Sequence, residues 1–87
     1  MTSKQLGWEG VLNGLAGTVQ LGATGAANHW AGSNGLDILG ALNYKNGWRS
    51  GGTKPYLDMA GVCNALAGTT GLDSLGALNY LLNGSYT

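Results

Sequence analysis

The sequence has few charged residues, a single cysteine, a single proline and no phenylalanine. Only four basic and four acidic side chains occur among 87 residues, and their formal charges cancel. Because nucleic-acid binding requires clustered Lys and Arg, this balance argues against a nucleic acid as the partner. A freely soluble small domain is expected to carry about 25–35% charged residues on its surface, whereas this chain has 9% in all. We therefore expect a partner to cover part of the surface.

Groups able to do chemistry are equally sparse. Cys63 is the only cysteine and His29 the only histidine, so neither an internal disulfide nor a Cys/His metal-ligand spacing is available. The slot of Cys63 is held by apolar residues in related segments, which favours a buried thiol over a reactive one. No spacing suggests an acid–base or nucleophilic set, and no phosphate-binding loop is present. We expect no enzymatic activity, no cofactor and no metal site.

Long hydrophobic runs are also missing. No stretch approaches the roughly 18 apolar residues needed to cross a bilayer, and residues 1–6 lack the apolar centre of a signal peptide. A chain of 87 residues is one domain, and a domain of this size buries little more than about 60% of the surface of its unfolded chain. We expect a single domain over 1–87, of marginal stability, that is made in a cytoplasm.

The chain instead contains a 15-residue repeat that is present five times. The copies span 6–20, 21–35, 36–50, 57–71 and 72–84, and an insertion, 51–56, separates the third copy from the fourth. Every copy has an Asn in one slot and a Gly three residues earlier. The Asn residues are Asn13, Asn28, Asn43, Asn64 and Asn79, and the Gly residues are Gly10, Gly25, Gly40, Gly61 and Gly76. A fixed period of this kind predicts a repeat architecture.

Each copy is predicted to form a short helix, with a capping residue at each of its two ends. Asp37, Asp58 and Asp73 are predicted N-caps, in a slot that Gly fills in the first two copies. A later Gly is predicted to end each helix in a left-handed cap, which gives helices such as Ile38–Asn46 and Ser74–Leu82. Because such short helices are unstable alone, they must pack together. The sequence thus predicts an all-α fold of five short helices, with one longer loop after the third copy.

The recurring Asn and Gly require their own explanations. An Asn among Leu and Ala is partly buried, and its amide must find partners. We expect it to cap the backbone of the next copy's loop; reading of a ligand by the Asn row is the alternative. A Gly inside a helix costs up to ~1 kcal/mol relative to Ala, so its recurrence suggests that a neighbouring backbone approaches closely there.

The segment around the insertion differs most from the repeat. It contains Trp48, Arg49, Lys54 and Tyr56, and Arg, Trp and Tyr are the residue types enriched at interface hot spots. These four residues are the candidate partner contact. The alternative is that Trp48 and Tyr56 cover the open end of a helical stack.

Several phrases resemble a known family of repeats. The segments 71–79, 56–62 and 64–69 are similar to the Leu-Asn-x-Leu-Ala-Gly-Thr repeats of virion structural proteins, minor capsid or minor tail, of tailed phages of actinobacteria. The resemblance extends from Leu6 to Gly84. It implies a non-enzymatic virion protein, assembled in the host cytoplasm, that binds the major capsid protein or another virion protein and is homo-oligomeric or present in many copies. We expect a head-associated decoration or minor capsid protein that cements the capsid lattice; the alternative is a minor tail or tail-tip protein.

Two other classes remain open. A membrane-active Gly-rich peptide would use small-x-x-x-small spacings such as Gly10 to Gly14, although such short helices do not span and each contains a polar Asn. An autonomous binding module would use the concave face of stacked repeats, and its first and last copies would need polar outer sides.

Overall fold

The computed structural model describes residues 6–84, and this range contains five α-helices and no strand. The all-α prediction is confirmed. The helices are α1 (Trp8–Ala16), α2 (Ala23–Ala31), α3 (Ile38–Lys45), α4 (Met59–Ala67) and α5 (Ser74–Asn83). Each helix lies within one copy of the repeat, so the 15-residue period is a period of helix plus connection.

The predicted N-caps are present in the last three helices. In each, the carboxylate of the Asp accepts a hydrogen bond from the backbone N–H three residues later, which satisfies a donor that the helix leaves unpaired. The pairs are Asp37 with Gly40 at 2.7 Å, Asp58 with Gly61 at 2.8 Å, and Asp73 with Gly76 at 2.7 Å. The N-caps of the first two helices are Gly7 and Gly22, which have no side chain to form this bond.

Left-handed glycines end four of the helices. Gly17, Gly32, Gly68 and Gly84 have φ values between 75° and 76°, which only glycine adopts without strain. Two predicted ends were wrong by one residue. α5 extends to Asn83 because its left-handed Gly comes one position later in that copy. α3 ends at Lys45, because the Gly47 N–H donates to the Tyr44 carbonyl and tightens the last turn.

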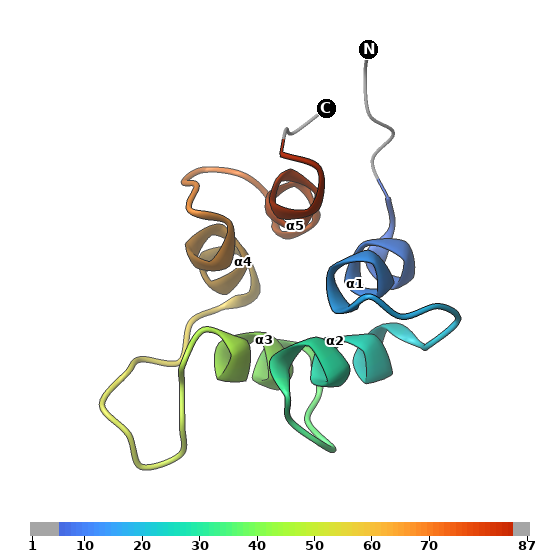
Figure 1. Ribbon diagram of the computed structural model, residues 1–87. Helices are drawn as coiled ribbons and strands as arrows, with labels where there is room; N and C mark the ends of the chain where they lie inside the picture. The colour runs from blue at the N-terminus through green and yellow to red at the C-terminus, as the bar shows by residue number, and fades with distance from the viewer. Residues whose placement is uncertain (1–5, 85–87) are drawn as a thin grey trace.

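The five helices form a closed ring (Figure 1). Among the described residues, each helix contacts the next one along the chain, α1 and α5 contact each other, and no other pair of helices is in contact. The Cα positions extend over 44 × 29 × 14 Å, so the ring is about as thick as a nine-residue helix is long. A ring has no first or last copy. The open stack with exposed ends, and with it the need for polar outer sides, is therefore not the arrangement of this chain.

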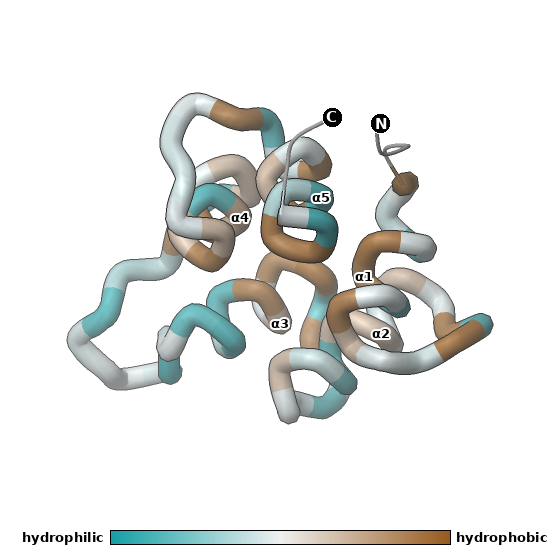
Figure 2. The backbone as a smooth tube through the Cα atoms, turned by 45° about the horizontal axis from the view of Figure 1, so that its top comes forward, coloured by the Kyte–Doolittle hydropathy of each residue, from teal (hydrophilic) through white to brown (hydrophobic). Residues whose placement is uncertain are grey.

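The core lies where the helices of the ring meet. It consists of the two residues that precede each Asn, and all ten have no exposed surface: Val11, Leu12, Ala26, Ala27, Ala41, Leu42, Val62, Cys63, Ala77 and Leu78. Leucines and aromatic residues pack against this core from outside. In Figure 2 the hydrophobic segments belong mainly to the helices, whereas the loop between α3 and α4 is hydrophilic and projects from the ring. The insertion is thus the part of the chain that is least involved in the core.

The expected close approach of a neighbouring backbone is not found at the recurring Gly of the first four copies, Gly10, Gly25, Gly40 and Gly61. The atoms nearest to a Cβ built on Gly10 or Gly25 would be those of the Leu side chain four residues earlier, at 3.5 Å or more. On Gly40 and Gly61 it would lie 2.8 and 2.7 Å from the capping Asp carboxylate. In these two copies the Gly therefore leaves room for the N-cap of its own helix, and no neighbouring helix is involved.

Close approach between helices occurs instead at Gly14, where α5 meets α1. A Cβ at this position would lie 2.8 Å from Cδ2 of Leu82. In the other copies the slot of Gly14 holds His29, Tyr44, Ala65 and Tyr80, while the slot of Leu82 holds Ala16, Ala31, Asn46 and Ala67. The contact that closes the ring thus combines the smallest residue of one slot with the largest residue of the other.

Candidate partner-binding surface

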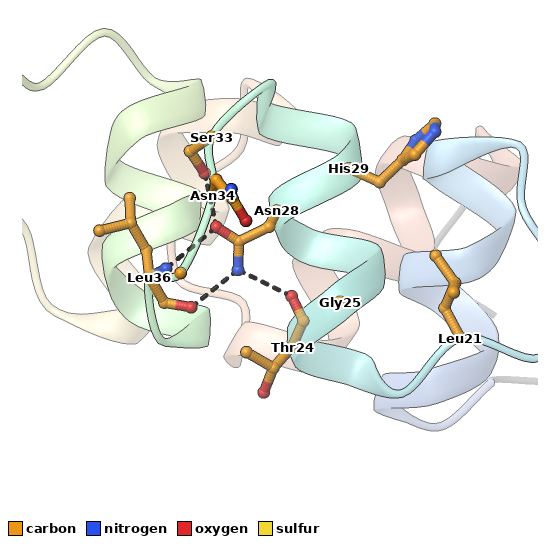
Figure 3. Close-up of a pocket in the computed structure, with 9 residues that line it drawn as sticks. Leu21, Thr24, Gly25, Asn28, His29, Ser33, Asn34 and Leu36 are labelled. Atoms are coloured by element: carbon orange, nitrogen blue, oxygen red, sulfur yellow. Dashed lines mark hydrogen bonds between the residues drawn. The ribbon is translucent and has the colours of Figure 1, made fainter.

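The Asn in each copy joins that copy to the next one. The side chain of Asn28 is typical (Figure 3). Its Nδ2 donates to the Thr24 carbonyl in its own helix at 2.9 Å and to the Leu36 carbonyl of the next copy at 2.7 Å. Its Oδ1 accepts from the Leu36 N–H at 3.2 Å and from the Ser33 hydroxyl at 2.8 Å. The amide is therefore fully used by one helix, its following loop and the first residue of the next copy.

The same reciprocal pair with a Leu occurs in every copy. The pairs are Asn13 with Leu21, Asn28 with Leu36, Asn43 with Leu57, Asn64 with Leu72, and Asn79 with Leu6. The third pair spans the six-residue insertion, and the fifth joins the two ends of the described chain. This arrangement explains the Leu that starts each copy, since its backbone N–H and carbonyl are the two groups that the Asn amide engages.

The Asn row is consequently structural. Four of the five side chains are buried, with at most 9% exposure, and no buried side-chain nitrogen or oxygen among the described residues lacks a hydrogen-bond partner. In all five copies both N–H groups of the amide are used by backbone carbonyls, which leaves no free donor for a ligand. The expected capping role of the Asn residues is found in all five copies.

Cys63 has the buried environment that its slot predicts. The side chain has no exposed surface, and desolvation raises the pKa of its thiol to about 12. A thiol with this pKa is protonated at neutral pH and is a poor nucleophile. Within residues 6–84 no group of three or more His, Cys, Asp or Glu side chains is placed to hold a metal ion.

The four predicted partner-contact residues all lie in or beside the projecting loop. Trp48 and Tyr56 pack edge to face, with ring centroids 4.9 Å apart and planes at 82°, so they support each other rather than cover an open end. The aliphatic stem of Lys54 lies against Gly47. Tyr56 is 48% exposed, and Arg49 and Lys54 are exposed as well.

Arg49 is held in place by one stacking contact and two hydrogen bonds near the end of α3. Its guanidinium lies 3.5 Å from the centroid of the Tyr44 ring. Its Nη1 donates to the carbonyls of Tyr44 and Trp48 at 2.9 and 2.8 Å. A stacked and hydrogen-bonded guanidinium loses less side-chain entropy when it binds a partner than a free one does.

Beside this Arg the surface forms a groove of about 510 Å³. One wall comes from the loop between α2 and α3, with Ser33 and Asn34, and the other from Tyr44, Trp48 and Arg49. Of the residues that line the groove, the sequence predicted Trp48 and Arg49 but not Tyr44, Ser33 and Asn34. Tyr44 directly follows the repeat Asn of its copy, in a slot that holds a different type of residue in most copies. Such variation within a repeat indicates a position on the surface.

Comparison of the chain with protein-family models, with curated proteins and with solved structures finds no match.

Proposed function

We propose that the chain is a non-enzymatic structural protein of a tailed-phage virion, a head-associated decoration or minor capsid protein that binds and cements the major capsid lattice. One observation carries the proposal beyond the resemblance of the repeats. Within residues 6–84 every buried side-chain nitrogen and oxygen has a hydrogen-bond partner, and the longest connection, between α3 and α4, projects from the ring with Trp48, Arg49 and Tyr56.

The shape of the ring suits attachment to a larger surface. It is a thin body, 14 Å in its smallest Cα dimension, that can lie against a lattice without a deep cleft in its partner. With only four basic and four acidic residues, it also has little charge to keep it apart from a protein surface. Aromatic and Arg side chains, like those in the loop, are the residue types that are enriched at interface hot spots.

The docking role of the loop can be tested without disturbing the ring. Replacing residues 48–56 by Thr-Thr-Gly, the sequence of residues 69–71, removes Trp48, Arg49 and Tyr56 and puts Leu57 eight positions after Asn43, which is the spacing from Asn64 to Leu72. Gly is chosen because the residue before this Leu has positive φ at Gln20, Gly35 and Gly71. We expect this variant to keep the helical content and cooperative unfolding of the wild type, and to be lost from purified particles.

Quantitative mass spectrometry of particles from the phage that encodes the chain measures both occupancy and copy number. Many copies per particle support the decoration role, whereas a few copies support the alternative, a minor tail or tail-tip protein. Absence of the chain from the particles would overturn the virion assignment. Unchanged occupancy by the loop-replacement variant would contradict docking through the loop but not the assignment.

The membrane-active alternative has a separate test. None of the helices in residues 6–84 is long and apolar enough to cross a bilayer, and Gly14 of its small-x-x-x-small spacing contacts Leu82 of the same ring. Release of a trapped dye from vesicles of phosphatidylglycerol and phosphatidylethanolamine, at concentrations where the ring is folded, would favour membrane activity over the proposal.

A further inference from the structure

We infer that the groove between the α2–α3 loop and the end of α3 binds an extended acidic segment of a partner protein, with a carboxylate held by Arg49. This inference rests on the proposed function for the identity of the partner, a virion protein. It specifies the chemistry of the contact, which the resemblance of the repeats leaves open.

Charge is separated within the ring although the chain is neutral overall. All three cationic side chains in residues 6–84 fall within ten positions of each other: Lys45, Arg49 and Lys54. Three of the four acidic side chains serve instead as N-caps of α3, α4 and α5. No acidic residue lines the groove. Arg49 is the one charged residue in the lining of the groove, and Lys45 and Lys54 lie in the flanking segment. The positive charge of the lining favours an acidic occupant.

The guanidinium of Arg49 is oriented for a carboxylate. Its Nη1 is occupied by the carbonyls of Tyr44 and Trp48, while no hydrogen bond within residues 6–84 engages Nε or Nη2. These two nitrogens form one edge of the planar group, and that edge matches the two oxygens of a carboxylate in a bidentate pair. Stacking on Tyr44 fixes the plane of the group before the partner arrives.

The other walls of the groove fit a polypeptide segment. Asn34 and Ser50 provide polar groups along the groove, and Trp48, which packs edge to face with Tyr56, provides an apolar surface. Polar groups of this kind pair with the backbone of an extended chain, and the aromatic ring accommodates a side chain next to the acidic one. Three cations are few for a nucleic acid, which requires several phosphate contacts for useful affinity at physiological salt. We therefore assign the groove to an acidic peptide.

Titration of the ¹⁵N-labelled full chain with poly-L-glutamate, followed by NMR, tests the inference directly. We expect amide shift changes confined to residues 32–36 and 44–56, and an affinity that falls as salt is raised. Arg49→Gln should weaken binding roughly tenfold, because it removes a charge-assisted bidentate pair. Arg49→Lys should weaken it by a smaller factor, because the ammonium keeps the charge but cannot form the fork.

Thr70→Glu is the matched control. It also lowers the net charge by one, but at an exposed position in the loop between α4 and α5, so binding should stay within about twofold of the wild type at moderate salt. Absence of poly-L-glutamate binding, shift changes elsewhere on the ring, or equal weakening by Arg49→Gln and Thr70→Glu would each overturn the inference. Binding of duplex DNA through the same residues, more tightly than poly-L-glutamate, would also overturn it.

The outcome is separable from that of the proposed function. If the chain is found in particles but Arg49→Gln is incorporated as well as the wild type, the virion assignment stands and the acidic-partner inference is wrong. If the chain is absent from particles while poly-L-glutamate binds the groove as described, the acidic-segment site stands and the virion assignment is wrong.

Discussion

The backbone N–H of Leu6 donates to Oδ1 of Asn79 at 2.8 Å, and Nδ2 of Asn79 donates back to the Leu6 carbonyl at 3.0 Å, across 73 positions of sequence. Between consecutive copies the same pair of bonds spans eight positions, as from Asn13 to Leu21, or fourteen across the insertion, from Asn43 to Leu57. The ring is therefore closed by the interaction that also links its consecutive copies, without the help of a short connection.

Backbone cyclisation should stabilise the ring. A bond from residue 86 to Leu6, with Tyr86→Gly and with residues 1–5 and 87 removed, places Leu6 eight positions after Asn79, the spacing from Asn13 to Leu21. Gly is chosen because this slot has positive φ at Gln20, Gly35 and Gly71. Closing a loop of this size removes chain entropy from the unfolded state, and by analogy with a cross-link it should raise the free energy of unfolding by up to about 4 kcal/mol. Urea denaturation of the cyclic and linear chains measures the difference.

A circular permutant provides the control for cyclisation. It has the same join but is opened between Gly51 and Gly52, in the projecting loop, so its unfolded chain is as free as that of the wild type. We expect it to fold to the same ring with an unfolding free energy within about 1 kcal/mol of the linear chain. A permutant that fails to fold would contradict the closed ring.

Replacing Asn43 by Asp should strongly destabilise the ring. Asn43 has no exposed surface, and its Nδ2 donates to the carbonyls of Leu39 and Leu57, both at 3.0 Å. Asp loses these donors and places a negative charge beside two carbonyl oxygens, which should cost about 3 kcal/mol or more at pH 7. Burial and the carbonyls raise the pKa of the new carboxyl in the folded state, so the loss should be smallest below the unfolded pKa and grow as pH rises.

Asn83→Asp is the control, because Asn83 is exposed at the end of α5. Its cost, from the helix dipole, should stay below about 1 kcal/mol. Thermal unfolding of both variants at pH 3.5 and pH 7 gives the comparison. If Asn43→Asp were as stable as Asn83→Asp at pH 7, the structural role of the Asn row would be disproved.

Two glycines of the second copy should respond to Ala in opposite directions. Gly25 lies in α2 with ordinary helical geometry, and a Cβ there would be 3.9 Å from its nearest neighbour, in Leu21. Gly25→Ala should therefore stabilise the ring, by about 0.5–1 kcal/mol. Gly32 has a φ of 76°, so Gly32→Ala should destabilise it by roughly 1–2 kcal/mol. Denaturation midpoints of the pair measure both changes, and equal signs would contradict the assigned backbone geometry.

The contact between Gly14 and Leu82 should appear as energetic coupling. In the wild type, Gly14→Ala brings a methyl group to 2.8 Å from Leu82 Cδ2, so we expect a loss of about 1 kcal/mol despite the better helix propensity. In a Leu82→Ala background the same change should instead stabilise, by up to about 1 kcal/mol. Gly10→Ala is the control, since the atoms nearest to its Cβ would be those of Leu6, at 3.5 Å or more, and its effect should not depend on residue 82.

Stability should fall in alkaline solution because of Cys63. Burial raises the thiol pKa from 9.0 to about 12, so the folded state holds this proton more tightly than the unfolded state does. The contribution is fully present below pH 9 and is lost as pH rises from about 9 toward 12, at up to about 1.4 kcal/mol per pH unit. Cys63→Ala introduces the residue that occupies this slot in the second copy, Ala27. The free energy of unfolding of this variant should fall less over the same pH interval. Urea denaturation at pH 8 and 10.5 tests this, and equal slopes would contradict a buried thiol.

The local structure was predictable from sequence because local signals determine it. The Asp N-caps and left-handed glycines act within one turn of helix, so Asp58 and Gly68 mark the ends of α4 in the sequence itself. The ring was not predictable, because the bond from Asn79 to Leu6 uses the same residue types as every other copy and period alone cannot show where the last copy turns. The predicted role of the recurring Gly, close approach to a neighbouring backbone, was wrong. The absence of a side chain at Gly40 instead leaves room for the Asp37 side chain that caps the same helix.

The candidate surface was half predictable. Trp48 and Arg49 depart from the repeat, and departures from a repeat are visible in sequence. Tyr44, Ser33 and Asn34 lie in ordinary slots of two different copies, and only the packing of α2 beside α3 brings them to the same groove. Contacts across copies depend on the angle between neighbouring helices, which the 15-residue period does not encode.

Closure also makes the number of copies a fixed integer. An open solenoid gains or loses units at its ends, because each unit touches only its neighbours. Here a sixth 15-residue unit would have to change the angle at every contact between helices before the last Asn could again meet the first Leu. Descendants of such a chain are expected to diverge through substitutions in the exposed slots and through length changes in the connection after α3, while the count of helices stays at five.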